Sequence, residues 1–161
     1  MKPRITVGVG DVAVSDDTSK EIVTFSLGSC IGVVLYDPRV KVGGLLHIML
    51  PDSNLNLERA TKQPAVFADT GLPILFRSAY ALGAKKGRMR VVLVGGSQVM
   101  DATGHFNIGK RNYTAVRKIF WRNNVLVDAE DIGGNVNRTV GIDVATGQVW
   151  VKTNGMEVKA L

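Results

Sequence analysis

Apolar residues along this chain fall into short runs typical of strands and into two stretches with helical spacing. Strands are predicted at residues 21–27, 31–36, 42–48, 91–94, 139–144 and 148–152. Helices are predicted from the apolar positions Leu72, Leu75, Phe76, Ala79 and Leu82, and from Tyr113, Val116, Ile119 and Phe120. This order, with strands at both ends and helices between, favours an α+β fold with mixed or antiparallel sheets over a doubly wound parallel sheet.

Polar residues predict how these elements begin and connect. We expect Asp69 to cap the first helix and Asn107 the second. Residues 52–64 are polar and rich in turn formers, which predicts a mobile surface loop. That loop is either a lip over a site near His47 or a simple connection.

Residues 4–14 contain a motif that resembles a dinucleotide-binding site but lacks the helix that such a site requires. Gly8, Gly10 and Ala13 match a dinucleotide-binding fingerprint. The fingerprint requires a helix after the glycines, so that the helix N-terminus faces a pyrophosphate. Here a short apolar stretch leads instead into a turn-rich segment at 15–19. Residues 4–14 are therefore predicted as strand and turn.

The two runs at 31–36 and 42–48 predict a β-hairpin that holds the candidate chemistry. Asp37 and Pro38 suit the first two positions of a type I turn ending at Val40. A turn with Asp37 opposite Val40 would place Cys30 opposite His47, and side chains in such a pair have Cβ atoms roughly 4.5–5.5 Å apart. A slip of one residue would send the two side chains to opposite faces.

A cysteine and a histidine in contact form a nucleophile and a general base. The imidazole takes the thiol proton and later protonates a leaving group. Gly28 allows a tight turn, and the backbone N–H groups of Ser29 and Cys30 are candidates for holding an oxyanion. The alternative is that Cys30, which lies among apolar residues, is an inert buried thiol.

Composition narrows the class of protein. The 161 residues predict one domain at 1–161, and 45% apolar with 21% charged residues is ordinary for a globular protein. The net charge of +6 favours an acidic protein surface, nucleic acid or anionic lipid as partner. One cysteine excludes an internal disulfide, and the short apolar runs predict a cytoplasmic protein with no membrane insertion. The two histidines, including His105, lack zinc-ligand spacing, so no metal is assigned.

Four elements of the chain together carry a resemblance to a known family. They are Val23-Thr24, Leu27-Gly28-Ser29-Cys30, the run from Gly44 to His47 that continues to Met49-Leu50-Pro51, and Asn107-Ile108-Gly109 followed by Arg111-Asn112. In combination, and at this spacing, they resemble the chemotaxis deamidase family CheD, and the similarity extends through nearly the whole chain. The family often has Gly-Arg after its paired glycines where this chain has Asn137-Arg138.

The resemblance implies a protein-glutamine deamidase of chemoreceptors. It implies that Cys30, His47 and Thr24 act together, that Thr24 orients the imidazole, and that no cofactor is needed. It adds weight to a recognition site at the start of the second helix, at Asn107, Gly109, Arg111 and Asn112. It also implies hydrolysis of receptor methyl esters and a layered sandwich of helices and sheets similar to deamidating bacterial toxins.

The resemblance further implies two partners, which are the helical cytoplasmic bundle of a chemoreceptor and the chemotaxis phosphatase CheC. Two other classes of function remain open from the residues themselves. One is a non-catalytic adaptor that binds receptor or phosphatase through the basic second helix. The other is a nucleic-acid-binding domain, although aromatic residues make up only 6% of the chain and no base-stacking platform is apparent.

Overall fold

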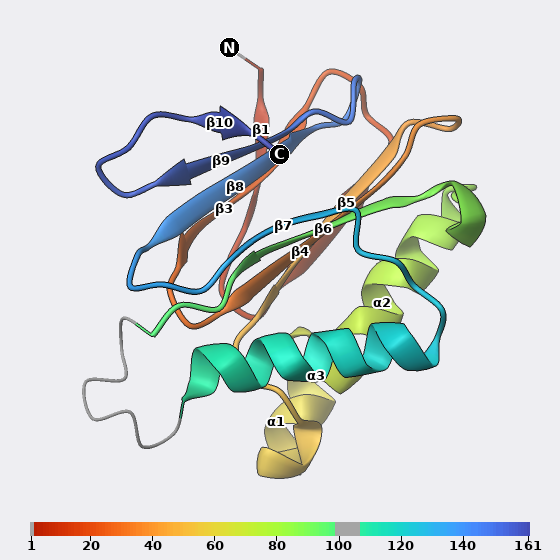
Figure 1. Cartoon of the computed structure of the whole chain (residues 1–161). Helices are drawn as coiled ribbons and strands as arrows, with labels where there is room; N and C mark the ends of the chain where they lie inside the picture. The colour runs from red at the N-terminus through yellow and green to blue at the C-terminus, as the bar shows by residue number, and fades with distance from the viewer. Residues whose placement is uncertain (1, 99–106) are drawn as a thin grey trace.

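A computed structural model of the chain describes residues 2–98 and 107–161, which form three layers (Figure 1). The outer sheet has the strand order β1 (Arg4–Val7), β3 (Glu21–Leu27), β8 (Arg138–Asp143), β9 (Val149–Thr153) and β10 (Lys159–Ala160). The central sheet has the order β2 (Val12–Ser15), β5 (Val42–Ile48), β4 (Ile31–Asp37), β6 (Arg90–Gly95) and β7 (Ala129–Ile132). The helices α1 (Leu57–Lys62), α2 (Ala68–Ala81) and α3 (Ile108–Arg122) form the third layer. The α+β prediction is confirmed.

Both sheets are mixed, as expected. Strand β1 runs parallel to β3 and β6 runs parallel to β7, whereas the other pairs are antiparallel. The hairpin predicted near the C-terminus is present as β8 and β9, and the short strands β7 and β10 were not predicted.

The central sheet is buried on both faces, which explains its nearly continuous apolar runs. Along β4, Ile31, Val33 and Leu35 pack in the core shared with α2 and α3. Val34 and Tyr36 point the other way, into the core between the two sheets. The side chains of β4 and β5 that face the outer sheet therefore lie in the interior of the molecule.

Helix α2 has the predicted apolar face but a different beginning. Its N-cap is Phe67, and Asp69 instead accepts hydrogen bonds from Ser53 N (2.9 Å) and Ser53 Oγ (2.5 Å). The capping prediction for Asp69 was wrong because the carboxylate has this partner in the preceding segment. A Cβ on Gly44 would lie 2.9 Å from a Leu75 methyl group, so the glycine allows α2 to pack closely on β5.

The prediction of a mobile loop at 52–64 was also wrong. This segment forms the 3₁₀ turn η1 (Ser53–Leu55), helix α1 and the start of a second 3₁₀ turn, η2 (Pro64–Val66). Asp52 accepts a hydrogen bond from Asn54 N, and Asn56 accepts one from Arg59 N. The polar residues taken as loop formers are thus caps of short helical turns. A third 3₁₀ turn, η3 (Lys86–Arg88), precedes β6.

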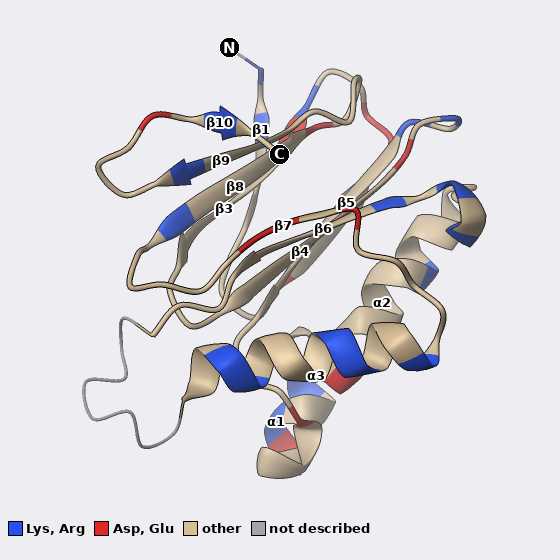
Figure 2. Cartoon of the chain, viewed as in Figure 1, with Lys and Arg blue, Asp and Glu red and all other residues tan. Residues whose placement is uncertain are grey.

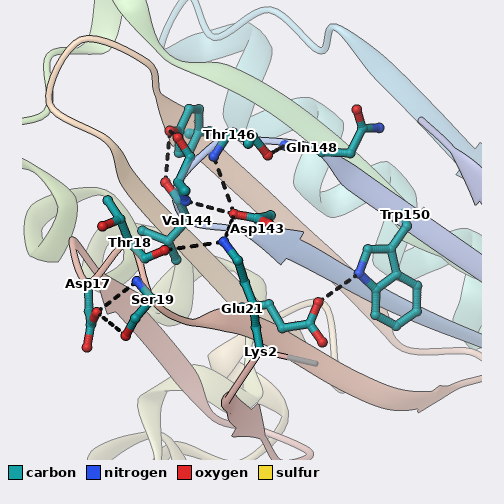
Figure 3. A network of polar contacts seen from close by, with 12 residues as sticks. Lys2, Asp17, Thr18, Ser19, Glu21, Asp143, Val144, Thr146, Gln148 and Trp150 are labelled. Atoms are coloured by element: carbon teal, nitrogen blue, oxygen red, sulfur yellow. Dashed lines mark hydrogen bonds and ion pairs between the residues drawn. The ribbon is translucent and has the colours of Figure 1, made fainter.

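Residues 4–14 form two strands and no helix, as expected, but the strands belong to different sheets. Figure 3 shows how the N-terminus is attached to the outer sheet. Lys2 Nζ lies 2.7 Å from Asp143 Oδ1, and the Trp150 indole donates to Glu21 Oε2 at 3.3 Å. These contacts join the two ends of the chain within one sheet.

Helix α3 follows Asn107, whose backbone is left-handed at φ 47° and ψ 47°, and its side chain makes no capping hydrogen bond. A capping side chain normally requires extended backbone at this position, so the predicted cap was wrong in its geometry. The predicted loop through Met100, His105 and Phe106 lies outside the described residues. Among the described helices, none is both long and apolar enough to span a membrane.

A buried ion pair holds the far end of the β4–β5 hairpin. The fully buried Asp37 carboxylate accepts hydrogen bonds from Arg39 N, Lys85 N and Arg88 Nε at 2.9–3.0 Å, and lies 2.9 Å from Arg88 Nη2. Burial alone would raise the pKa of this carboxyl, but the Arg88 contact and the two backbone donors outweigh it and hold the pKa below its ordinary value.

We expect Asp37→Asn to lower the free energy of unfolding by roughly 2–4 kcal/mol, because Arg88 loses its charged partner. The contribution of Asp37 is present above the ordinary aspartate pKa of about 3.9 and is lost as the pH falls through the lower native value. Urea unfolding at pH 7 and at pH 3 should therefore differ more for the wild type than for the variant. The control is Asp16→Asn, at an exposed carboxylate, and an equal loss in both variants would contradict the prediction.

Candidate active site

The hairpin pairs in a register two residues away from the predicted one. Asp37 lies opposite Val42, not Val40, and Gly32 lies opposite His47. The connecting turn contains four residues, 38–41, and Lys41 closes it with a left-handed backbone at φ 54°. The expectation that Cys30 lies directly opposite His47 was therefore wrong. Because the shift is even, however, both residues still belong to the same face of the hairpin.

His47 is fully buried and faces the outer sheet. Its neighbours Leu46 and Ile48 pack toward the helices, so the imidazole lies on the opposite face of β5. There, Nδ1 lies 2.7 Å from the hydroxyl oxygen of Thr24, a fully buried residue of β3. The hydrogen bond therefore crosses from one sheet to the other.

The hydroxyl of Thr24 determines which imidazole nitrogen carries the proton. Thr24 Oγ1 also lies 2.7 Å from the carbonyl oxygen of Val7, which can only accept. The single hydroxyl proton is donated to Val7, so Thr24 must accept from His47 Nδ1–H. Nε2 is then the unprotonated nitrogen, and it is buried with no hydrogen-bond partner among the described residues.

Burial keeps the imidazole neutral, because it lowers the pKa of His47 to about 4. A buried nitrogen without a partner is rare in proteins, and a catalytic role is one of the explanations for it. The histidine is thus held in one tautomer, with a free lone pair, and is ready to accept a proton.

Cys30 precedes β4 and packs at the edge of the core between the sheets. It is a free, half-buried thiol, and burial raises its pKa to about 11. No hydrogen bond joins Cys30 to His47, although both lie on the same face of the hairpin. Their diagonal relationship corresponds to a Cα separation of roughly 7–8 Å. Gly32, the residue opposite His47, puts no side chain between them.

The turn before Cys30 is fixed by the loop that follows β6. Ser97 N donates to the carbonyl of Gly28 at 2.8 Å, and Gly96 N donates to the carbonyl of Cys30 at 2.9 Å. Among the described residues, the backbone N–H groups of Ser29 and Cys30 donate to no other residue. The turn thus has its carbonyls bonded and two amides available.

Two glycines permit this close approach. A Cβ on Gly95, whose φ is 118°, would lie 2.2 Å from the carbonyl oxygen of Cys30. A Cβ on Gly109 would lie 2.2 Å from the carbonyl oxygen of Ser97. A larger residue at Gly95 would separate the turn from β6, and one at Gly109 would separate the loop after β6 from α3. Gly109 is buried and has a packing role at this contact.

Asn112 joins helix α3 to both chain segments of the site. Its side-chain amide donates to the carbonyl oxygens of Ser29 and Met49, each at 2.9 Å, and the residue is fully buried. Ser29 precedes Cys30, and Met49 follows His47 by two residues. Asn112 is thus placed to position the site from within the protein, whereas Arg111 is exposed and lines a groove on the other side of α3.

Arg138 supports the same loop from the outer sheet. The nearly buried guanidinium donates to Ser97 Oγ at 2.8 Å and to the carbonyl of Gly95 at 3.3 Å, and it pairs with Asp131 at 3.2 Å. Ser97 had no predicted role. Its position directly after Gly95-Gly96 is the only sequence signal for a structured turn there.

Comparisons with known proteins agree with this arrangement. The family model described as CheD chemotactic sensory transduction matches residues 49–153. A relative from Syntrophus aciditrophicus, named "Probable chemoreceptor glutamine deamidase CheD 1", is 49% identical and covers 98% of each chain. A relative from Anaeromyxobacter dehalogenans, named "Probable chemoreceptor glutamine deamidase CheD 2", is 46% identical over 92% of this chain and 94% of its own. The chain belongs to the CheD family.

The resemblance inferred from the four sequence elements is thereby confirmed. One solved structure, a Neisseria meningitidis protein of the DUF152 family, covers 83% of this CheD chain and 63% of its own at 13% identity. Its TM-score of 0.46 is too low to support an argument. Within residues 2–98 and 107–161, no three His, Cys, Asp or Glu side chains cluster as metal ligands would.

The protonation states in this CheD chain predict how Cys30 reacts in the free protein. Burial raises the pKa of the Cys30 thiol to about 11. At any pH below that value, the thiolate fraction grows about tenfold for each unit by which the pH rises. We therefore expect the rate of carbamidomethylation by iodoacetamide to rise about tenfold per unit from pH 6 to pH 9. A cysteine in an unstructured peptide, as the control, should level off near the ordinary thiol pKa of about 8.5. A plateau below pH 7 for Cys30 would instead reveal a preformed thiolate–imidazolium pair.

Asn112 provides a test of how the site is held together. We expect Asn112→Ala to lower the free energy of unfolding by roughly 1–3 kcal/mol, because two carbonyl groups lose their donor. The Cys30 turn should also loosen, so alkylation of Cys30 at pH 8 should accelerate. Asn135→Ala, at an exposed position, is the matched control. If Asn112→Ala destabilises the protein but leaves the rate of Cys30 alkylation unchanged, Asn112 contributes to stability without positioning the Cys30 turn.

Proposed function

We propose that this protein is a chemoreceptor glutamine deamidase, in which Cys30 is the nucleophile, His47 the general base and Thr24 the residue that orients the imidazole. The observation that carries the proposal is the Thr24–His47 hydrogen bond, with its acceptor at Val7. It leaves His47 Nε2 as an unprotonated, unpartnered nitrogen on the face of the hairpin that also carries Cys30. A purely structural histidine would be expected to use both nitrogens when buried.

The first step forms a thioester. The Cys30 sulfur attacks the side-chain carbonyl carbon of a substrate glutamine while Nε2 of His47 accepts the thiol proton. Both groups are neutral at rest, so proton transfer accompanies the attack instead of preceding it. A side-chain rotation closes the remaining distance between sulfur and imidazole once the substrate is bound.

The tetrahedral intermediate places negative charge on the former amide oxygen. The backbone N–H groups of Ser29 and Cys30 would donate to that oxygen, and their carbonyls are already fixed by Asn112 and Gly96. The imidazolium then gives its proton to the departing nitrogen, and ammonia leaves.

Water completes the reaction. Nε2 of His47 takes a proton from water, the hydroxide attacks the thioester, and the sulfur leaves as the thiol. The net change is an amide plus water to a carboxylic acid plus ammonia, with the enzyme restored and no cofactor consumed. A glutamyl methyl ester would react in the same way and release methanol. A layered sandwich of helices and sheets similar to that of deamidating bacterial toxins is also part of this proposal.

The proposed substrate is the helical cytoplasmic part of a chemoreceptor, which places the protein in the cytoplasm. The names of the relatives cited above support a chemoreceptor as substrate. The phosphatase CheC is a second proposed partner, which would compete with the receptor. Neither partner requires nucleic acid or insertion into a membrane.

The test is the intact mass of a receptor cytoplasmic fragment after incubation with the protein. Each deamidated glutamine should add about 1 Da and release one ammonia, and Cys30→Ala and His47→Ala should abolish both signals. Thr24→Val should lower kcat roughly 10- to 100-fold by losing the oriented tautomer, whereas Thr24→Ser should retain most activity. If the wild-type protein binds the fragment but the mass of the fragment does not increase, the protein is a non-catalytic adaptor and not a deamidase.

A further inference from the structure

A groove of about 700 Å³ lies on the solvent side of α3, outside the catalytic constellation. Its lining residues come from α3, the segment after β5 and the first turn of α2: Pro51, Asp52, Asn54, Asp69, Asn107, Lys110, Arg111, Thr114, Ala115, Lys118, Ile119 and Arg122. Figure 2 shows the basic segments that recur along α3. The groove is therefore a hollow in which positively charged side chains outnumber negatively charged ones.

Within residues 2–98 and 107–161, the cations of the groove have no ion-pair partner. Lys110, Arg111, Lys118 and Arg122 are all exposed, and among the described residues none of these side chains makes an ion pair or hydrogen bond. The two carboxylates in the lining are already occupied. Asp52 accepts from Asn54 N, and Asp69 accepts from Ser53. The groove thus offers four free cations to a partner.

The groove lies beside the catalytic segments. Asn112, on the α3 turn whose neighbours line the groove, bonds the carbonyls of Ser29 and Met49. Pro51, which lines the groove, follows His47 by only four residues. Arg111 lines the groove and its neighbour Asn112 bonds the Cys30 turn, so the groove and this turn lie on two sides of the same end of α3.

We propose that this groove docks an acidic helical segment of the protein substrate and delivers a glutamine on the same chain to Cys30. The proposal rests on the deamidase function and specifies how its substrate is chosen. The side chains of Arg111, Lys118 and Arg122 recur along one face of α3, at successive spacings of about 10 and 6 Å along its axis. A helix with glutamates every one or two turns presents carboxylates at matching intervals.

One feature of the lining favours an acidic protein over nucleic acid. The lining contains no aromatic side chain on which a base could stack. Complementary charge of this kind sets the rate of encounter and the choice of partner.

The test measures binding with Cys30→Ala protein, which cannot turn the substrate over. The probe is a synthetic helical peptide with one central glutamine and glutamates at every fourth position, and a matched peptide has serines in place of the glutamates. We expect the acidic peptide to bind at least about tenfold more tightly, and the difference to shrink in high salt. Equal affinity for the two peptides would overturn the proposal.

Variants of the groove identify where the peptide binds. Lys118→Glu with Arg122→Glu should raise the Kd of the acidic peptide about tenfold, and the corresponding glutamine substitutions should raise it less. The control is Arg39→Glu with Lys41→Glu, which makes the same charge change at the exposed turn at the far end of the hairpin and should leave the Kd unchanged. If both double variants lose the same affinity for the acidic peptide, the effect comes from net charge alone, and the proposal of a specific docking groove is wrong.

Two further measurements distinguish failure of the docking proposal from failure of the deamidase proposal. In otherwise wild-type protein, the groove variants should raise KM for a receptor fragment while kcat stays within about twofold. If no fragment is deamidated by the wild type, the deamidase fails, and the peptide-binding result still decides the docking site. A single-stranded oligonucleotide that outcompetes the acidic peptide, and loses affinity in the groove variants, would assign the groove to nucleic acid instead.

Discussion

The hydrogen bond between Thr24 and His47 depends on the packing of two separate sheets. Thr24 belongs to β3 of the outer sheet and His47 to β5 of the central sheet, and each residue is fully buried. The Val7 carbonyl, which fixes the direction of the bond, belongs to a third strand, β1. Any change in sheet packing would alter the tautomer, so the chemistry of His47 is tied to the stability of the whole β sandwich.

The turn that carries Cys30, the proposed nucleophile, depends on a different set of contacts. The turn carrying Cys30 is bonded through three successive carbonyls, which accept from Ser97 N, the Asn112 side chain and Gly96 N. These donors come from the loop after β6 and from α3, and Arg138 braces the loop from the outer sheet. All three layers therefore contribute to one turn. Bonding the carbonyls inward leaves the amides of Ser29 and Cys30 available for an oxyanion.

The sequence was sufficient for the long strands and the two long helices, but not for α1, β7 and β10 or for the registers and caps. Apolar periodicity located the β4–β5 hairpin and both long helices, because burial imposes those patterns directly. It failed at the turn, where Lys41 adopts a left-handed backbone and lengthens the loop. It failed also at Asp69, whose partner Ser53 lies 16 residues away. Such contacts depend on tertiary structure, which local propensity does not contain. Thr24 was singled out only by family resemblance, because its partner lies across the sandwich.

The neutral resting state of the site has a consequence for selectivity. With a pKa near 11 for Cys30 and near 4 for His47, neither group is charged at neutral pH, and no hydrogen bond joins them. The free protein is thus a poor nucleophile, which protects the thiol from indiscriminate reaction. In the proposed reaction, activation comes from the bound substrate, whose developing oxyanion would be stabilised by the turn while the thiol proton moves to Nε2. Binding energy from outside the reacting amide is then needed to hold that arrangement. In the proposed docking, the exposed cations along α3 supply such energy and leave the buried site free of additional charge.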